Sequence, residues 1–462
     1  MVECRCTFDA LLAISGASEE AIRSQRTKSP TKVHGKHLNV STSVSSPTAS
    51  SYSFREMHVR ACSNWLVAVS AMEKKLDMDG SAAPGVVVLG AGIHGASVAY
   101  YLSTRFNIQS TIVERSSVGA AASGKAGGFL ARNWGSGSTS QLHEVSFDMH
   151  ASLARDLEIS SYRAIATLSV DGSRKGQTDA NWLDKKAKSK PMDSATAQVT
   201  PLELTQKLID TAVRRGCRLV LGTVTGVRLI GDGKAIQAVL VDGHEEPILA
   251  SKLVVCLGPW SGVFCEDHFG VEVPMEGVKS TSLVFSAAEA VKQEPFACFC
   301  EEDRNGCHLE LYPRANGEVY ICGCGGSDNV SGDRLRRGGD CEKPELIHAD
   351  PKRVAAACAS FRDMSTLGER APDITQACMR PCTPDGLPVM GEIPGVDGAF
   401  VSAGHNCWGI LWAPASGLAM AELVATGKSS TIDLTAFRVN RFTRGNSRRG
   451  KKKGEAEVGE QW

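Results

Sequence analysis

The feature that most constrains this chain is an apolar run, residues 86–89, that leads directly into a glycine-rich turn. Gly90, Gly92 and Gly95 fit the spacing G-x-G-x-x-G, and small residues follow, as in a helix packed closely on a strand. A second apolar run, residues 111–113, comes next. This order predicts a strand, a tight turn, a helix and a parallel strand.

Each position in the turn meets a separate physical demand. Gly90 permits the tight turn, Gly92 lets the backbone approach a pyrophosphate, and Gly95 lets the helix lie close to the strand. The helix N-terminus offers free amides and a positive dipole end to phosphates. Glu114 ends the second strand, where its carboxylate would accept ribose hydroxyls and repel a 2′-phosphate. We expect a cofactor that contains ADP and is not NADP; the alternative is a βαβ unit that binds no nucleotide.

Composition narrows the class of protein. A chain of 462 residues with 42% hydrophobic residues and 46 glycines is typical of an α/β protein of two or three domains. Basic and acidic residues are both 51, so no net field favours nucleic acid. No apolar run approaches the roughly 20 residues of a membrane span. The 16 cysteines follow no disulfide or zinc spacing, which predicts reduced thiols in an intracellular compartment and no metal site.

The two ends of the chain differ from its middle. Residues 1–80 are rich in Ser and Thr, and no acidic residue occurs between Ala21 and Arg55. We interpret them as either a plastid or mitochondrial transit peptide or a disordered extension, so the location is cytoplasmic or organellar. Residues 441–462 are a basic polar tail.

Between the ends, the pattern indicates two kinds of sheet. Residues 200–203 read as a capping box before a helix, and residues 253–257 as a buried strand that opens onto a turn at Gly258. The β-like runs between 276 and 370 carry no phosphate-binding turn, so we expect them in a separate sheet. Near the end, a helix is expected to begin at Pro414.

Four motifs taken together resemble the D-amino-acid oxidase/sarcosine oxidase superfamily of FAD-dependent oxidoreductases. They are the first glycine turn with Glu114; a second glycine loop, residues 121–129; Leu257-Gly258-Pro259-Trp260-Ser261; and residues 380–391 followed by 403–409 and 413–417. The resemblance covers about residues 85–440 and is weakest over 280–370, where the substrate pocket would lie.

The resemblance implies an α/β fold (α+β overall): a Rossmann-like FAD-binding domain with an inserted substrate domain of mixed or antiparallel sheet. We expect the FAD domain over residues 84–275, with part of 165–195 assigned to either domain, and again over 371–440. The substrate domain would span 276–370. The implied reaction oxidises the C–N bond of a small amine or amino acid to an imine and passes the electrons to oxygen.

The cofactor-binding residues expected from the motifs lie in six segments. They are Gly90, Gly92, Ile93, His94 and Gly95; Glu114 and Arg115; Ser123, Gly124, Lys125, Gly127 and Gly128; Gly258 and Trp260; Cys378 and Gly386; and Gly404, Asn406, Gly409 and Ile410. In some sarcosine-oxidase-like proteins a cysteine at the place of Cys378 holds the flavin covalently. The alternative is a buried free cysteine beside a non-covalent FAD.

The candidate catalytic residues are His405, Arg314 and Trp408. His405 would bond the flavin or move protons, Arg314 would bind a substrate carboxylate, and Trp408 would form part of the pocket wall. Each has a plainer alternative: a histidine that shapes a loop, a solvated arginine of a hairpin turn, and a core aromatic. Lys125 and Lys279 could promote oxygen reduction, or serve only the structure.

Two other functions fit the same motifs. The first is a dehydrogenase of this fold that uses another electron acceptor or oxidises a hydroxy acid. The second is a flavoprotein relative with a non-enzymatic binding or trafficking role, suggested by the weak match over residues 280–370.

Overall fold

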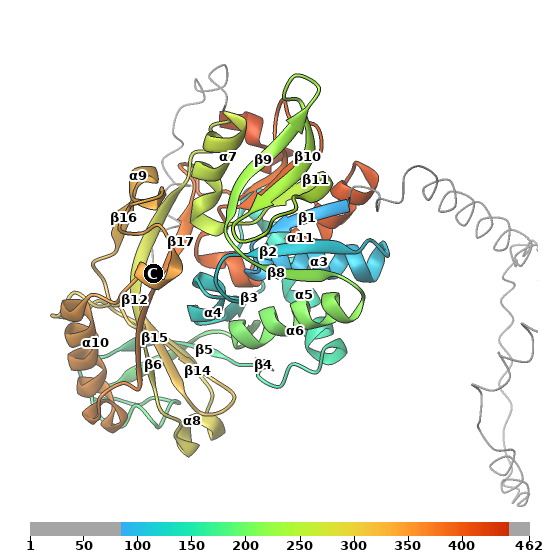
Figure 1. Ribbon diagram of the computed structural model, residues 1–462. Helices are drawn as coiled ribbons and strands as arrows, with labels where there is room; N and C mark the ends of the chain where they lie inside the picture. The colour runs from blue at the N-terminus through green and yellow to red at the C-terminus, as the bar shows by residue number, and fades with distance from the viewer. Residues whose placement is uncertain (1–84, 443–462) are drawn as a thin grey trace, which may run out of the picture. The chain divides into compact units, whose positions relative to one another are not determined.

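A computed structural model describes residues 85–442 (Figure 1). The expected N-terminal extension, and the expected tail from residue 443 onward, lie outside the described residues. Two large sheets and one small sheet make up the described part. The expected mixed α/β fold is confirmed.

The first large sheet is built around the strand that precedes the glycine turn. This strand, β1 (Gly85–Leu89), pairs in parallel with β2 (Ser110–Glu114) and with β11 (Ile248–Val255). The sheet is completed by β8 (Arg218–Leu221), β19 (Ala399–Ala403), β18 (Val389–Glu392) and the meander strands β9 (Val224–Ile230) and β10 (Ala235–Val241). The predicted strand–turn–helix–strand order is confirmed, with α3 spanning Ile93–Arg105.

Alternation along β1 sets the two layers that cover this sheet. Val86 and Val88 pack into the helical layer, and Val87 and Leu89 pack against the β9–β10 meander. The helices of the first layer are α3, α5 (Ser140–Asp156), α6 (Pro201–Arg214) and α11 (Gly409–Thr426), and α7 (Ser261–Phe269) belongs to the second. The glycine turn therefore emerges from a strand buried on both faces.

The second large sheet is mostly antiparallel. Its strands are β5 (Thr167–Asp171), β6 (Lys188–Asp193), β12 (Glu276–Phe285), β13 (Ala297–Cys300), β14 (Glu310–Pro313), β15 (Val319–Cys322), β16 (Asp328–Val330) and β17 (Ile374–Cys382). On one face Leu283, Leu311 and Ile321 pack against α10 (Pro351–Met364). The other face presents Tyr312 and Tyr320, and it faces the cavity described below.

Strands β5, β6 and β17 show how the chain crosses between the two large sheets. The first two come from the 165–195 region, so that region contributes to the second sheet. Strand β17 pairs with β12 from Glu276↔Cys382 to Val284↔Ile374. The segment expected to return to the FAD domain at residue 371 therefore first completes the second sheet, because β17 continues its ladder, and rejoins the first sheet only at β18.

The last helix begins earlier than the sequence predicts. Helix α11 starts at Gly409, and Pro414 lies inside it rather than at its first turn. A proline removes the amide that would bond the carbonyl four residues earlier, here that of Ile410. The buried His150 of α5 contacts this carbonyl through Nε2 at 3.1 Å, and also that of Leu411 at 3.0 Å. His150, 260 residues away in the sequence, thus replaces the hydrogen bond that Pro414 removes from the helix.

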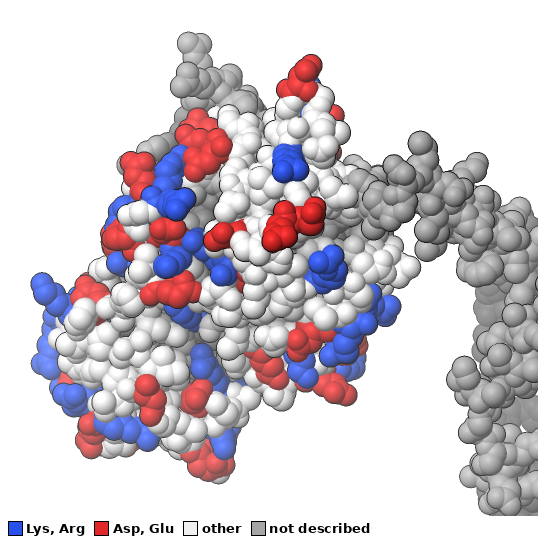
Figure 2. All heavy atoms as spheres, in the orientation of Figure 1, with Lys and Arg blue, Asp and Glu red and all other residues white. Residues whose placement is uncertain are grey.

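Helix α11 lies in the hydrophobic core of the helical layer that covers the first large sheet. By length and composition Asn406–Thr426 is the one candidate span among the described residues, but 72% of its apolar window is buried inside the protein. The short helices α4 (Ala122–Lys125), α8 (Glu289–Gln293) and α9 (Gly332–Leu335) complete the α-helices of the described residues. Basic and acidic side chains are interspersed over the face shown in Figure 2, and every cysteine between residues 85 and 442 is a free thiol.

Candidate cofactor and substrate site

The glycine turn after β1 admits no side chain at two of its positions. Gly90 has φ +95°, and a Cβ there would lie 2.5 Å from the carbonyl oxygen of Cys256. A Cβ on Gly95 would overlap the Gly90 carbonyl. A Cβ on Gly92 would lie 3.1 Å from Ser123 Oγ, a tight contact that a small shift of the serine side chain would relieve. The backbone is therefore bare where a phosphate group would approach.

Two polar side chains brace this turn. The Glu114 carboxylate accepts hydrogen bonds from the backbone amides of Ala91 (2.8 Å) and Ser116 (2.9 Å), and it is 9% exposed. Ser123 Oγ accepts the amide of Ile93 at 2.8 Å, which joins the second glycine loop to the first. Glu114 thus holds the turn as well as facing the cavity, and its remaining lone pairs are available to ribose hydroxyls.

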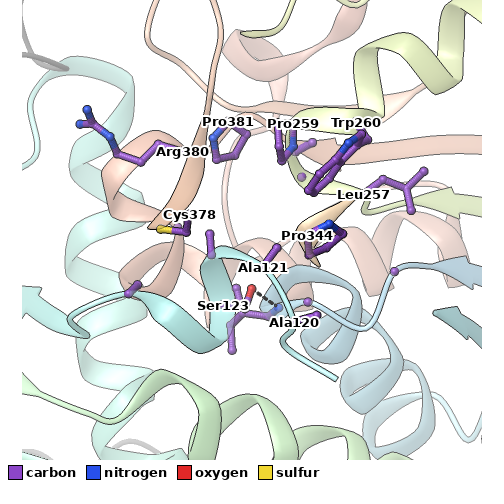
Figure 3. Close-up of a pocket in the computed structure, with 18 of the residues that line it drawn as sticks. Ala120, Ala121, Ser123, Leu257, Pro259, Trp260, Pro344, Cys378, Arg380 and Pro381 are labelled. Carbon is purple, nitrogen blue, oxygen red and sulfur yellow. Dashed lines mark hydrogen bonds between the residues drawn. The ribbon is translucent and has the colours of Figure 1, made fainter. Parts of the chain in front are cut away.

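A cavity of about 1090 Å³ runs from this turn to the second sheet. Figure 3 shows three separate segments around it, represented by Ala121, Trp260 and Cys378. The expected site residues that line it are Gly90, Gly92, Ile93, His94, Glu114, Arg115, Ser123, Gly127, Gly128, Gly258, Trp260, Cys378, His405, Asn406, Trp408, Gly409 and Ile410. One continuous space therefore joins the glycine turn to the expected flavin loops.

Six expected residues do not line this cavity. They are Gly95, Gly124, Lys125, Gly386, Gly404 and Arg314. The glycines among them are required by the backbone conformation. Gly386 and Gly404 have φ of +73° and +78°, and a Cβ on Gly124 would overlap the carbonyl of Gly119. Their contribution is to shape the walls rather than to touch a ligand.

The arginine expected to bind a carboxylate lies elsewhere. Arg314 pairs with Glu318 of the same hairpin at 3.0 Å, and its guanidinium stacks over the Tyr320 ring, 5.6 Å from the centroid. Four arginines line the cavity, Arg115, Arg336, Arg337 and Arg380, and of these Arg380 lies on a strand of the second sheet, β17. The sequence indicated that Arg380 could belong to the site, because this residue opens the 380–391 motif. The face of the sheet on which Arg380 lies depends on the pairing of β17 with β12.

Two imidazoles stack where the first turn meets the start of α11. The rings of His94 and His405 have centroids 3.5 Å apart and an interplanar angle of 17°. Among the described residues, none makes a hydrogen bond of normal geometry to their buried nitrogens. Burial lowers the pKa of His94 to about 3, with a partial offset from the Gly409 backbone. Burial, and then His94, lower the pKa of His405 well below its usual range. Both rings are therefore neutral at pH 7.

The second sheet forms the opposite wall of the cavity. Register places Cys378 and Arg380 of β17 on the same face as Tyr320 and Cys322 of β15, with Glu310 opposite Cys322. Phe129, Trp134 and Trp408 line the cavity from the first domain, and Phe129 stacks on Tyr312 with a centroid distance of 5.3 Å. This half of the cavity combines one guanidinium, one carboxylate and an aromatic wall.

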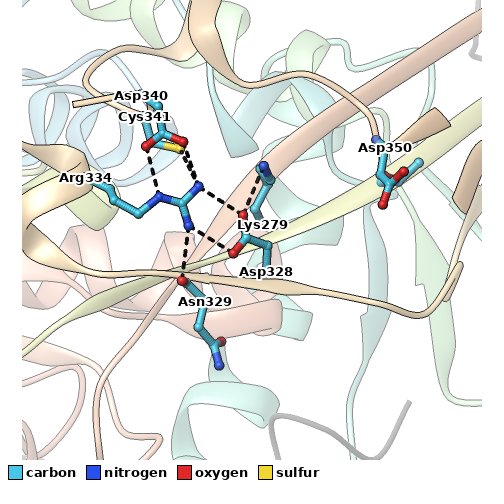
Figure 4. A network of polar contacts seen from close by, with 8 residues as sticks. Lys279, Asp328, Asn329, Arg334, Asp340, Cys341 and Asp350 are labelled. Carbon is cyan, nitrogen blue, oxygen red and sulfur yellow. Dashed lines mark hydrogen bonds and ion pairs between the residues drawn. The ribbon is translucent and has the colours of Figure 1, made fainter. Parts of the chain in front are cut away.

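A segment of the second domain, residues 332–346, covers the nucleotide half of the cavity. Arg115 donates to the carbonyl of Glu342 at 2.7 Å, and Trp260 Nε1 donates to that of Cys341 at 3.1 Å. Arg334 anchors the segment between the carboxylates of Asp328 (2.9 Å) and Asp340 (2.8 Å) (Figure 4).

The same network holds Lys279, which pairs with Asp328 at 3.1 Å and does not line the cavity. Lys125 does not line the cavity either. The positions of these two lysines favour structural roles over a direct part in oxygen reduction.

These observations fit FAD. The turn is bare at Gly90 and Gly92, Glu114 faces the cavity from the end of β2, and polar atoms of His94 and His405 are buried without partners among the described residues. The fold and the site define a dinucleotide-binding oxidoreductase with its substrate space between two sheets.

Comparison with known families identifies the class. The model of the family described as FAD-dependent oxidoreductase, the DAO family, matches residues 85–423. The chain therefore belongs to the DAO family, is an enzyme of the FAD-dependent oxidoreductase class, and the family resemblance drawn from its motifs is confirmed.

Individual proteins similar to this chain include amino-acid oxidases. Glycine oxidase of Pseudomonas aeruginosa is 25% identical over 378 residues, which cover 75% of this chain and 96% of the relative. A Schizosaccharomyces pombe protein named as an oxidoreductase is 26% identical over 392 residues, covering 76% and 96%.

Among solved structures, L-amino acid deaminase from Proteus myxofaciens is similar in fold, with a TM-score of 0.66, 18% identity and coverage of 78% of this chain and 94% of that one. Glycine oxidase from Geobacillus kaustophilus has a TM-score of 0.60 with 21% identity, covering 77% and 98%.

Proposed function

We propose that this protein oxidises the C–N bond of a small α-amino acid to an imine, with oxygen as the final electron acceptor. The observation that carries the proposal is Arg380, which lines the same cavity as the expected flavin loops. A planar guanidinium recognises a carboxylate by two parallel hydrogen bonds. FAD, when bound, supplies the acceptor for the hydride equivalent that leaves the substrate carbon.

The chain would hold FAD through the elements that line the cavity. The bare turn at Gly90 and Gly92 would receive the diphosphate, and Glu114 the ribose. The start of α11, at Gly409 and Ile410, also lines the cavity. The positive end of its dipole would stabilise negative charge that develops on the cofactor.

The similar proteins support an amino-acid substrate rather than a simple amine. Glycine oxidase and L-amino acid deaminase both act, by their names, on molecules with an α-carboxylate. Arg380 gives this chain a group of the matching charge at the cavity. The aromatic wall would exclude water from the bound substrate.

Anaerobic mixing of the FAD-loaded protein with a panel of α-amino acids, amines and 2-hydroxy acids tests the proposal. We expect amino acids to bleach the flavin absorption band, and hydrogen peroxide to appear when air is admitted. Bleaching without peroxide would indicate a dehydrogenase with another acceptor, and bleaching by hydroxy acids alone would replace the C–N substrate. A flavin that no compound reduces would contradict the proposal.

We propose that FAD is bound here without a covalent link. Cys378 lines the cavity, so the thiol is in reach of a bound group. Burial raises the pKa of this thiol, although Arg380 and Lys125 act in the opposite direction. A thioether would need the thiolate as nucleophile. Denaturing electrophoresis under ultraviolet light should show no fluorescent protein band, and a band that Cys378→Ser abolishes would establish the link.

A further inference from the structure

Glu310 is a carboxylate on the cavity wall that the proposed reaction has not used. It lies on β14, lines the cavity, and sits opposite Cys322 in the β14–β15 ladder. Its Oε2 accepts hydrogen bonds from the Tyr312 hydroxyl and from the Cys322 thiol, the latter at 3.3 Å. This oxygen acts only as an acceptor in these contacts. Among residues 85–442, no donor is found on Oε1.

Glu310 and Arg380 line the same cavity and influence the pKa of the same thiols. The pKa of the Cys322 thiol is raised well above its usual range by burial and by Glu310, while Arg380 opposes the rise. The same two groups influence the pKa of the Cys407 thiol, on the loop before α11. Desolvation raises this pKa, Arg380 lowers it, and Glu310 raises it. A positive and a negative group therefore share one face of the second sheet and one cavity, and both influence the same two thiols.

Aromatic rings line the rest of this space. Phe129, Tyr312 and Tyr320 form a ladder of nearly parallel rings, with centroid distances of 5.3 and 6.1 Å. Trp134 and Phe299 pack at an angle to the ladder, with centroids 5.3 Å apart. All five rings line the cavity. Such a wall favours an apolar or aromatic group on the ligand.

We propose that the substrate is a zwitterionic α-amino acid with a bulky apolar or aromatic side chain, and that Glu310 binds its ammonium group while Arg380 binds its carboxylate. This inference rests on the proposed function and narrows it. Glu310 is then a specificity-determining residue, because its charge favours the ammonium group and disfavours a carboxylic acid that lacks one. The aromatic wall discriminates against glycine-sized substrates.

Ligands that cannot react separate binding from turnover. α-Methylphenylalanine carries both charges but has no α-hydrogen to lose, and 2-methyl-3-phenylpropanoate is the same molecule without the ammonium group. 2-Aminoisobutyrate keeps both charges and lacks the ring. Each is titrated into the FAD-loaded protein, and dissociation constants are read from the change in the flavin absorption spectrum. The three constants report the amine and the side chain separately.

We expect the zwitterion to bind about 10- to 100-fold more tightly than the des-amino acid, as for a hydrogen bond to a charged group. Glu310→Gln should remove most of this ratio while the des-amino acid binds at least as well as before. The matched control is Glu318→Gln, which alters the same hairpin at the Arg314 pair, outside the cavity, and should keep the ratio. 2-Aminoisobutyrate should bind about 10-fold or more weakly than α-methylphenylalanine.

Two results would overturn the inference. One is a Glu310→Gln protein that retains both its bound flavin and the wild-type ratio. The other is an equal affinity for 2-aminoisobutyrate and α-methylphenylalanine. In either case bleaching of the wild-type flavin by amino acids would still support the proposed function. If no amino acid bleaches it and no carboxylate perturbs its spectrum, the proposed function fails together with this inference.

Discussion

Replacement of His150 by alanine tests how the helix that follows the expected flavin loop is held in place. His150 is 1% exposed and contacts the carbonyls of Ile410 and Leu411 in the first turn of α11. Pro414 cannot donate a hydrogen bond to the Ile410 carbonyl, because proline has no amide hydrogen. Without His150 this carbonyl is buried beside a helix that offers it no donor.

The expected cost has two parts. A buried carbonyl that loses its donor costs about 1–3 kcal/mol, and truncation of a buried ring adds a cavity term of about 2 kcal/mol. We therefore expect His150→Ala to lower the free energy of unfolding by about 3–5 kcal/mol. The change should also loosen the start of α11, where Gly409 and Ile410 line the cavity.

A double-mutant cycle isolates the hydrogen-bond part. In a Pro414→Ala background the new amide at position 414 can bond the Ile410 carbonyl, so His150→Ala should cost about 1–2 kcal/mol less than in the wild type. The cavity term is common to both backgrounds and cancels. Urea unfolding at one fixed FAD concentration, followed by tryptophan fluorescence, measures all four proteins. Equal costs of His150→Ala in the two backgrounds would refute the reasoning.

Three further predictions concern the turn and its pH dependence. Gly95→Ala should destabilise the fold by about 1–3 kcal/mol by overlap with the Gly90 carbonyl, and Gly92→Ala by less, measured by urea unfolding. Glu114→Ala should raise the FAD dissociation constant about 10-fold or more; an unchanged constant in a fluorescence titration would contradict its assigned role. Burial lowers the pKa of His150 from 6.5 to about 4, so below pH 6.5 the unfolded chain binds more protons than the folded one. Stability should therefore fall by about 3 kcal/mol as the pH drops from 6.5 to 4, and a flat profile would count against a buried neutral ring.

Local patterns predicted the glycine turn and the position of the acidic residue beside it. The turn at Gly90 follows from backbone geometry over a few residues, and Glu114 lies one strand further on, so neither needed knowledge of distant contacts. The order of motifs also placed the loops before α11 near the same cavity, where Asn406 and Gly409 are found.

Features set by long-range pairing were not predictable in the same way. Arg380 rather than Arg314 lines the cavity because of the register of β17 on β12, which no local pattern states. The helix α6 forms as expected, but Glu203 does not complete a capping box. It accepts hydrogen bonds from Ser160 and Ser161, more than 40 residues earlier in the chain. Pro414 was read as a helix start because its compensating partner, His150, is remote in sequence.

The most direct test of the account is a titration of the apoprotein with FAD, monitored by the quenching of flavin fluorescence and by the absorption spectrum. The account predicts saturation at one FAD per chain, competition by ADP, and weaker binding in the Glu114→Ala protein. A well-folded protein that stays colourless in excess FAD would contradict it, because the bare glycine turn would then hold no nucleotide.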